Sequence, residues 1–268
     1  MNLGELLYQS VDSLEKLVQV LSIEFSAPVS VPHADHFVFR HDPRQRSDVL
    51  ASFLKTVRIM SLLKASLSLL EKGYVQEVYI LCRAIDEAVE DIIFLAHHIG
   101  DTGTSEEQKR LVNEFYQEEF SDPNDPLSTK ERDRVPRRKI RAVLSQMPIG
   151  FGDPSTTNQV AKSLFQVFSG FVHGSYVSIM EMYGGRHPKY HTDGMLNSPR
   201  ISECEENMVN YVFRSILAVE AVSHRVKRKD IVEETLALSR QLAEQTGCIK
   251  ADGLERLKRR KDRVADKG

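Results

Sequence analysis

The sequence predicts an all-α protein, an antiparallel helical bundle of about seven to nine helices. Apolar residues recur at three- and four-residue spacing over most of the chain, and runs with the two-residue alternation of strands are nearly absent. The chain has 268 residues, of which 41% are hydrophobic, so it can bury a large core. We therefore expect a single all-helical domain over 1–268, with its central bundle at about 47–226.

The first half of the chain contains three predicted helices. Apolar residues at helical spacing predict an N-terminal helix over 2–25, at the periphery of the bundle. The pattern resumes over 47–72, and Gly73 follows where a left-handed C-cap is favourable. A second long helix, 74–99, begins almost at once. Two long helices joined through one glycine must lie roughly antiparallel, so an αα-hairpin is expected at the centre of the fold.

Periodicity and capping motifs place the remaining helices. Ser-x-x-Glu or Ser-x-x-Gln spacings, which are typical of helix starts, begin at Ser105, Ser128 and Ser202. Long amphipathic helices over 157–183 and 203–226 complete the expected central bundle. Shorter C-terminal helices within 230–265 are expected at the periphery. The stretch 184–199 contains three glycines and two prolines, which predicts a long loop.

Charge and cysteine content limit the cellular compartment and the kinds of partner that the sequence allows. The 36 basic and 38 acidic residues give a formal charge of −2, so a nucleic-acid partner must be met by a local basic patch. The three cysteines form no C-x-x-C pair, and the N-terminus does not resemble a secretory signal. No apolar run is long enough to cross a bilayer. We therefore expect a cytoplasmic protein with no membrane partner.

Charge is unevenly distributed around residue 127. An acidic segment, 106–125, is followed directly by a basic segment, 130–141. The main interpretation is two solvated helices that attract each other, and a phosphate-binding face is the alternative. The histidine-rich stretch 33–42 is interpreted as a capped loop, with zinc binding as the weaker alternative.

The stretch from Ser169 to His191 carries the most chemistry. Apolar helices do not collect titratable groups by propensity alone, so we expect a site here. Ser169, His173 and Tyr176 share one face of the helix expected over 157–183. The loop that follows supplies further candidates for binding and catalysis, Arg186, Lys189, Tyr190 and His191.

The expected partners of His173 lie on the helix over 74–99. This helix carries a polar stripe that consists of Tyr79, Arg83, Asp86, Glu87 and Glu90. Arg83 and Glu87 are four residues apart and therefore adjacent on the helix surface. We expect a pocket built from Arg83, Glu87, His173 and the 186–191 loop. Two interpretations stay open: an interhelical lock, or a catalytic or ligand-binding cluster.

These segments resemble a known superfamily. Leu-Cys-Arg-Ala-Ile-Asp-Glu at 81–87, Ser169, and Phe-Val-His-Gly at 171–174 resemble the uncharacterised bacterial all-helical proteins grouped with the HEPN-like superfamily. The resemblance covers about 47–225. It implies an antiparallel helical bundle, commonly a homodimer. Many members are metal-independent ribonucleases in toxins and phage defence.

The family motif is an arginine followed four to six residues later by a histidine, and Arg186 to His191 has this spacing. The resemblance implies attack by a ribose 2′-hydroxyl, with His173 or His191 as base and Arg83 or Arg186 stabilising the phosphorane charge. Glu87 belongs to the same catalytic set. The implied substrate-binding residues are Ser169, Tyr176, Lys189 and Tyr190.

The predicted function is therefore RNA binding or metal-independent RNA cleavage in defence or RNA metabolism. The alternative is a non-catalytic interaction or small-anion-binding protein whose polar cluster is structural. No metal or cofactor is expected, because the sequence lacks Glu-x-x-His pairs on the predicted helices, a P-loop and a dinucleotide-binding fingerprint.

Overall fold

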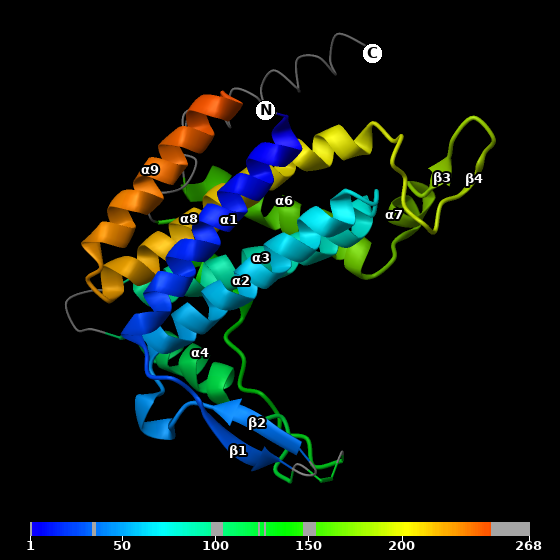
Figure 1. Ribbon diagram of the computed structural model, residues 1–268. Coiled ribbons are helices and arrows are strands. Elements are labelled where there is room, and N and C mark those ends of the chain that lie inside the picture. Colours follow the sequence, from blue (N-terminus) through cyan, green and yellow to red (C-terminus); the bar gives the residue numbers. More distant parts are fainter. Residues whose placement is uncertain are drawn as a thin grey trace.

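The computed structural model describes residues 2–33, 36–97, 104–122, 124–125, 127–146 and 154–247. Over these ranges the chain forms nine α-helices and two short antiparallel strand pairs (Figure 1). The predicted all-α class is confirmed. The part of the predicted C-terminal helices that falls within 248–265 lies outside the described residues.

Helices α2 (Asp48–Leu70) and α3 (Val75–Ala96) form the predicted αα-hairpin at the centre of the molecule. Ser47 caps α2, because its side chain accepts a hydrogen bond from the Leu50 amide. Gly73 adopts φ +79° in the turn between the two helices, a conformation that glycine reaches without steric cost. The turn is therefore tight enough to bring the two helices side by side.

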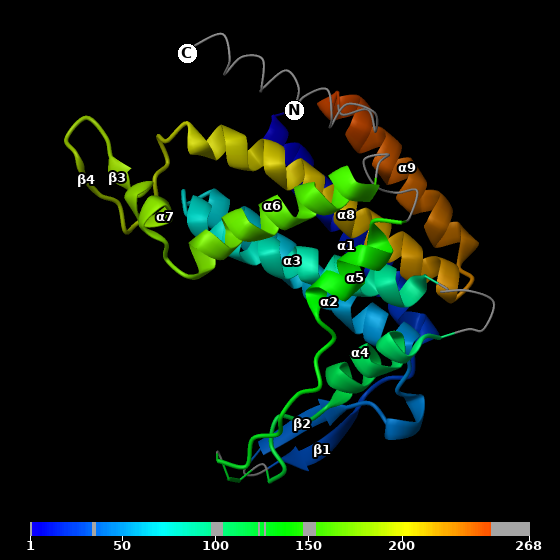
Figure 2. The same cartoon turned by 180° about the vertical axis from the view of Figure 1, so that it is seen from behind.

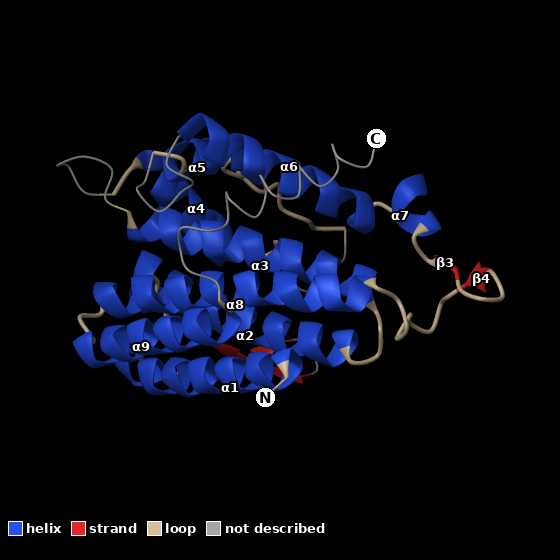
Figure 3. Ribbon diagram, turned by 90° about the horizontal axis from the view of Figure 1, so that it is seen from above, coloured by secondary structure: helices blue, strands red, loops and turns tan. Residues whose placement is uncertain are grey.

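Three further helices complete the main core. Helices α1 (Leu3–Leu21), α8 (Arg200–Arg225) and α9 (Lys229–Thr246) pack against α2 or α3, or against one another. Their buried residues belong to the same apolar cluster as those of α2 and α3. α1 and α9 therefore share the core of the central helices. Figure 3 shows α5 and α6 on one side of α3, and α1 and α9 on the other side.

Helices α4 (Glu106–Tyr116) and α5 (Arg137–Leu144) close one end of α3 over a smaller apolar cluster. The capping box predicted at Ser105 is present. The helix predicted after Ser128 is wrong, because the Ser128 hydroxyl donates to the carbonyls of Asp122 and Asp125 in a loop. The helix start predicted at Ser202 is also wrong, since α8 already begins at Arg200.

A β-hairpin follows α1. Strands β1 (Val29–His33) and β2 (His36–Arg40) pair antiparallel, with Val29 opposite Arg40 and Ser30 opposite Phe39. The interpretation of this stretch as a capped loop is therefore wrong. The strand residues Val31, Phe37 and Phe39 have high β-propensity, but each strand is only five residues long. Two 3₁₀ turns, Ser22–Glu24 and Pro43–Gln45, flank the hairpin.

The helix predicted over 157–183 is two helices, α6 (Pro154–Val172) and α7 (Tyr176–Met180). Gly174 adopts φ +59°, which ends α6, and the Ser175 side chain caps α7 by accepting from the Ser178 amide. The chain then forms a small hairpin, β3 (Tyr183–Gly184) and β4 (Lys189–Tyr190), which projects from one end of the bundle (Figure 1). The single helical face predicted for Ser169, His173 and Tyr176 is therefore interrupted.

No helix in the described part of the chain combines the length and apolar content needed to span a bilayer.

Candidate functional site

The residues predicted to form one pocket occupy two places in the structure. Arg83 and Glu87 meet on α3, where the Arg83 Nε lies 3.3 Å from the Glu87 Oε1. His173 is exposed at the end of α6, and none of the side-chain contacts found within the described ranges involves its ring. The structure therefore does not bring the imidazole to the guanidinium.

Phe165 is the α6 residue that reaches Arg83. The Cζ atom of Arg83 lies 4.2 Å from the centroid of the Phe165 ring. His173 follows eight residues later, which corresponds to about 12 Å along a helix axis. One turn further along α6, Phe168 and Phe171 stack on Tyr79 of α3, with centroid distances of 5.5 and 5.2 Å. The face of α6 that meets α3 is thus aromatic.

Helices α5, α6 and α8 all contact α3 (Figure 2). Residues of these four helices line a small cavity. Its volume is about 30 Å³, room for about two or three water-sized groups. Its apolar lining is Phe165 and Phe168. Its charged lining comes from Arg83, Asp86 and Glu90 of α3, Arg141 of α5 and Arg214 of α8. We refer to it as the arginine cavity. With all five groups ionised, three positive charges face two negative charges.

Ion pairs tie the carboxylates of the arginine cavity to neighbouring helices. Asp86 accepts hydrogen bonds from the Arg214 Nη1 and, at 3.0 Å, from the Tyr211 hydroxyl. Glu90 accepts from the Arg141 Nε at 2.8 Å. Burial raises the pKa of both carboxyls above their ordinary values, although the arginines oppose this shift. Both pairs fix α3 against α5 and α8.

A third buried carboxylate lies beside the cavity. Asp91, almost fully buried, accepts from the Lys55 Nζ at 2.8 Å and from both Nη atoms of Arg137. Arg137 also donates to the carbonyl of Glu87. The basic segment 130–141 therefore does more than attract the acidic segment, because its first helical turns neutralise buried carboxylates of α3.

Unpaired polar atoms mark the arginine cavity. Among the described residues, only His41 Nδ1, Arg83 Nη1 and Glu90 Oε2 are buried side-chain atoms without a hydrogen-bond partner. Two of these three belong to residues that line the cavity. A buried polar atom left unpaired costs roughly 1–3 kcal/mol. Arg83 and Glu90, which both line the cavity, thus keep an unused donor atom and an unused acceptor atom, respectively.

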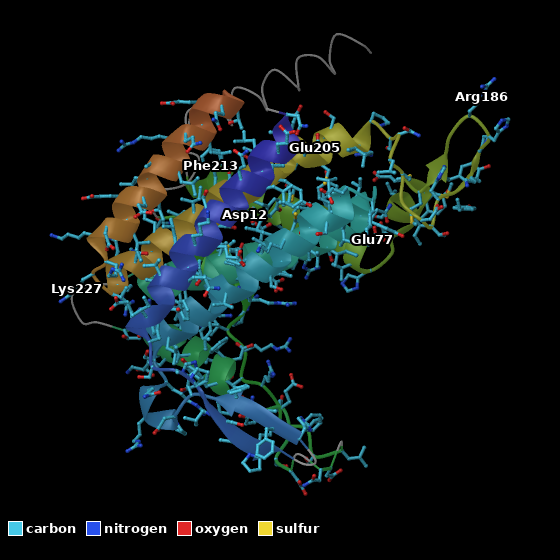
Figure 4. The ribbon with its side chains drawn as sticks, in the orientation of Figure 1. Asp12, Glu77, Arg186, Glu205, Phe213 and Lys227 are labelled. Carbon is cyan, nitrogen blue, oxygen red and sulfur yellow. The ribbon has the colours of Figure 1, made fainter. Side chains whose placement is uncertain are left out.

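The other predicted residues lie on the last turn of α6, on α7 and on the β3–β4 hairpin, beyond the α6 residue that contacts Arg83. Ser169 is half-buried, whereas 79% of Tyr176 is exposed. Arg186 lies at the tip of the hairpin, at the opposite end of the molecule from Lys227 (Figure 4). Lys189 is exposed on β4. Within the described ranges, no carboxylate pairs with Arg186 or Lys189.

Aromatic rings pair across the hairpin. Tyr183 is opposite Tyr190, and their ring centroids are 4.8 Å apart. Both rings stay about half exposed. His191, half-buried after β4, bonds through Nε2 to the Gly184 carbonyl at 3.1 Å. This bond holds the His191 ring against the first strand and occupies one of its two nitrogens.

The base of the hairpin is tied to the bundle. The Met195 amide donates to the Gly73 carbonyl at 3.0 Å, and the Gln76 side chain donates to the Ser178 carbonyl. Arg200 at the start of α8 pairs with Glu181 at 2.7 Å. The projecting residues are therefore carried on an anchored support.

Sequence reasoning missed Arg141, Arg214 and Phe165. Arg141 was visible only as part of a basic run, and Arg214 as one cation on an amphipathic helix. No local pattern links either residue to α3, because the arginines lie 51 and 128 positions from the carboxylates that they bind.

No group of histidine, cysteine and acidic side chains within the described ranges has an arrangement that could hold a metal ion. The polar residues predicted from the sequence thus lie in two places, the projecting hairpin and the arginine cavity. Comparisons of the chain with protein-family models, curated proteins and solved structures find no match.

Proposed function

We propose that this protein binds single-stranded RNA through α7 and the β3–β4 hairpin. The observation that carries the proposal is the solvent exposure of aromatic and basic side chains on this one projecting element. Tyr176, Tyr183 and Tyr190 expose 79%, 44% and 56% of their surface, respectively. Rings of this kind stack on unpaired bases without regard to sequence.

The local charge supports the same partner. Residues 183–191 contain Arg186 and Lys189 and no acidic residue, although the whole chain carries a net charge of −2. Phosphate contacts and base stacking together are typical of single-strand binding surfaces. The major groove of an RNA helix is too narrow for side chains to read its bases. A projecting hairpin therefore contacts the bases of unpaired nucleotides more readily than those of a duplex.

RNA cleavage, which the HEPN-like resemblance implies, would have to use Arg186 and His191. Arg83 pairs through Nε with Glu87 and stacks on Phe165, and His173 lies about two helical turns from that contact, so the two cannot act together. His191 keeps Nδ1 free of the bond to Gly184 if Nε2 carries the proton. The proposed function is therefore RNA binding. Any RNA cleavage would use Arg186 and His191 of the hairpin.

The test is fluorescence anisotropy with a short labelled single-stranded RNA over a range of salt concentrations. In the double variant Arg186→Gln/Lys189→Gln, we expect the slope of log affinity against log salt to fall by about 1.4, or about 0.7 for each lost phosphate contact. Tyr190→Ala should weaken binding by about 1–3 kcal/mol.

The matched control is Lys229→Gln/Arg240→Gln, which removes two exposed cations from α9. This control should bind RNA with unchanged affinity and salt slope. Equal effects of the two double variants would mean that binding follows total charge, and would rule out a hairpin site. Intact RNA after incubation with the wild-type chain would rule out cleavage and leave binding as the activity.

A further inference from the structure

The arginine cavity has the features of a second binding site, independent of the hairpin. Its charged groups come from three helices that are far apart in the sequence, so the cavity exists only in the folded chain. The ion pairs that extend from the lining add two carboxylates, Glu87 and Asp91, and two cations, Arg137 and Lys55. Five cations then face four carboxylates, so one positive charge remains. An anion would therefore be favoured there over a neutral molecule or a cation.

The unpaired atoms define the ligand more closely. Arg83 Nη1 needs an acceptor, and Glu90 Oε2, when ionised, needs a donor. The Glu90 Oε2 atom lies 3.9 Å from the nearest Arg137 nitrogen, which is too far for a hydrogen bond. A ligand that satisfies both atoms must offer an acceptor to Arg83 and a donor to Glu90. Together with the excess positive charge of the cavity, this favours an oxyanion that also carries a hydroxyl group.

Size and shape restrict the ligand further. A volume of about 30 Å³ holds only a few heavy atoms. A guanidinium group is flat and prefers to bind planar oxyanions through parallel hydrogen bonds. The stacking of Arg83 and Arg141 on Phe165, at 4.2 and 4.3 Å, fixes both groups before any ligand arrives.

We infer that the arginine cavity binds a small planar oxyanion that carries one hydroxyl group, the chemistry of bicarbonate. Arg83 donates to its anionic oxygens and Glu90 accepts from its hydroxyl. Arg141 holds Glu90 in place through the bond between its Nε and the Glu90 Oε1.

The proposal is tested by thermal unfolding of the full chain at pH 8 with bicarbonate, nitrate or chloride at equal ionic strength. Nitrate is planar like bicarbonate but has no hydroxyl, so it cannot satisfy Glu90. A ligand at ten times its dissociation constant raises the ratio of folded to unfolded chain about elevenfold. We expect bicarbonate, and not nitrate, to raise the unfolding temperature above its value in chloride.

Two variants separate site binding from general salt effects. Arg83→Gln should abolish the bicarbonate effect, whereas Arg240→Gln on α9 should keep it. In Glu90→Gln the side-chain oxygen still accepts from Arg141, so the amide nitrogen offers a donor to the cavity. This variant should prefer nitrate to bicarbonate.

Three results would overturn the inference. Bicarbonate could stabilise the wild type no more than chloride does, which would mean that the cavity holds water only. Bicarbonate could stabilise Arg83→Gln as strongly as the wild type. If Arg83→Gln does not fold, Glu90→Gln alone decides, and an unchanged preference for bicarbonate in that variant would contradict the assigned contacts.

Discussion

The Arg83 guanidinium stacks on Phe165, with Cζ 4.2 Å from the ring centroid, and the same ring carries Arg141 at 4.3 Å. One aromatic side chain of α6 thus makes cation–π contacts with arginines of both α3 and α5. This contact occupies the position on α3 that the sequence assigned to His173. It also explains why the arginines of the cavity can lie close together, since the negative face of the ring is attracted to both.

Replacement of Phe165 by leucine should destabilise the fold although it keeps an apolar side chain. The loss of two cation–π contacts predicts a decrease of about 1–2 kcal/mol in the free energy of unfolding. Urea denaturation measures this change. The control is Phe37→Leu on the exposed β1–β2 hairpin, where 71% of the ring is exposed and we expect a change within about 0.5 kcal/mol. Equal losses at the two positions would contradict the role of Phe165.

The carboxyl of Glu90 should make stability depend on pH. Burial raises the pKa of Glu90 in the folded chain, so the unfolded chain loses this proton first as pH rises. The wild type should therefore lose stability relative to Glu90→Gln as pH rises from the ordinary carboxyl pKa of 4.5 to the raised value. Chemical denaturation of both proteins between pH 4 and pH 7 checks the sign. A relative gain of wild-type stability with rising pH would be inconsistent with this assignment.

Gly194 should tolerate no side chain. It adopts φ +90°, and a Cβ atom there would collide with the Lys72 carbonyl oxygen. Gly194→Ala must therefore displace the loop from the α2–α3 turn, with a loss larger than the roughly 1–2 kcal/mol of a left-handed alanine.

Two glycines provide matched controls for Gly194. Gly247 has φ +65°, and no atom of the described residues lies within 4 Å of a Cβ atom placed there, so Gly247→Ala should show the backbone cost alone. Gly184 has no positive φ, and within the described ranges nothing lies within 4 Å of a Cβ atom placed there, so Gly184→Ala should hardly change stability. Thermal unfolding should rank the losses in the order Gly194, Gly247, Gly184. A loss at Gly194 no larger than the loss at Gly247 would show that the predicted close contact is absent.

His173→Ala should leave stability unchanged within about 0.5 kcal/mol, because the imidazole is exposed and has no side-chain partner within the described ranges. The interhelical lock predicted from the sequence would require a much larger loss. Chemical denaturation measures the change. The comparison variant is Asn207→Ala, which removes an α3–α8 contact, the 3.0 Å hydrogen bond from Asn207 Nδ2 to the Tyr79 hydroxyl.

Much of the fold could be predicted because its signals are local. The Gly73 turn and the Ser105 capping box each depend on residues within one helical turn. The break at Gly174 was missed, since glycine occurs both inside helices and at their ends, and the apolar pattern continues through it. Strands of five residues are likewise too short for periodicity to detect.

The candidate site was less predictable. The polar stripe of α3 was visible in the sequence, and Arg83 and Glu87 do pair within it. Its partners could not be chosen, because long arginine side chains from distant helices compete for the same carboxylates. Arg141 and Arg214 are selected by the packing of α5 and α8 on α3, which no spacing rule encodes.

Photo-crosslinking of a 4-thiouridine-labelled single-stranded RNA to the full chain, followed by peptide mapping, tests the proposed function most directly. We predict that the crosslinks fall within 173–191, on α7 and the β3–β4 hairpin. Crosslinks confined to the basic segment 130–141 would contradict the assignment and place the RNA on the other basic face of the molecule.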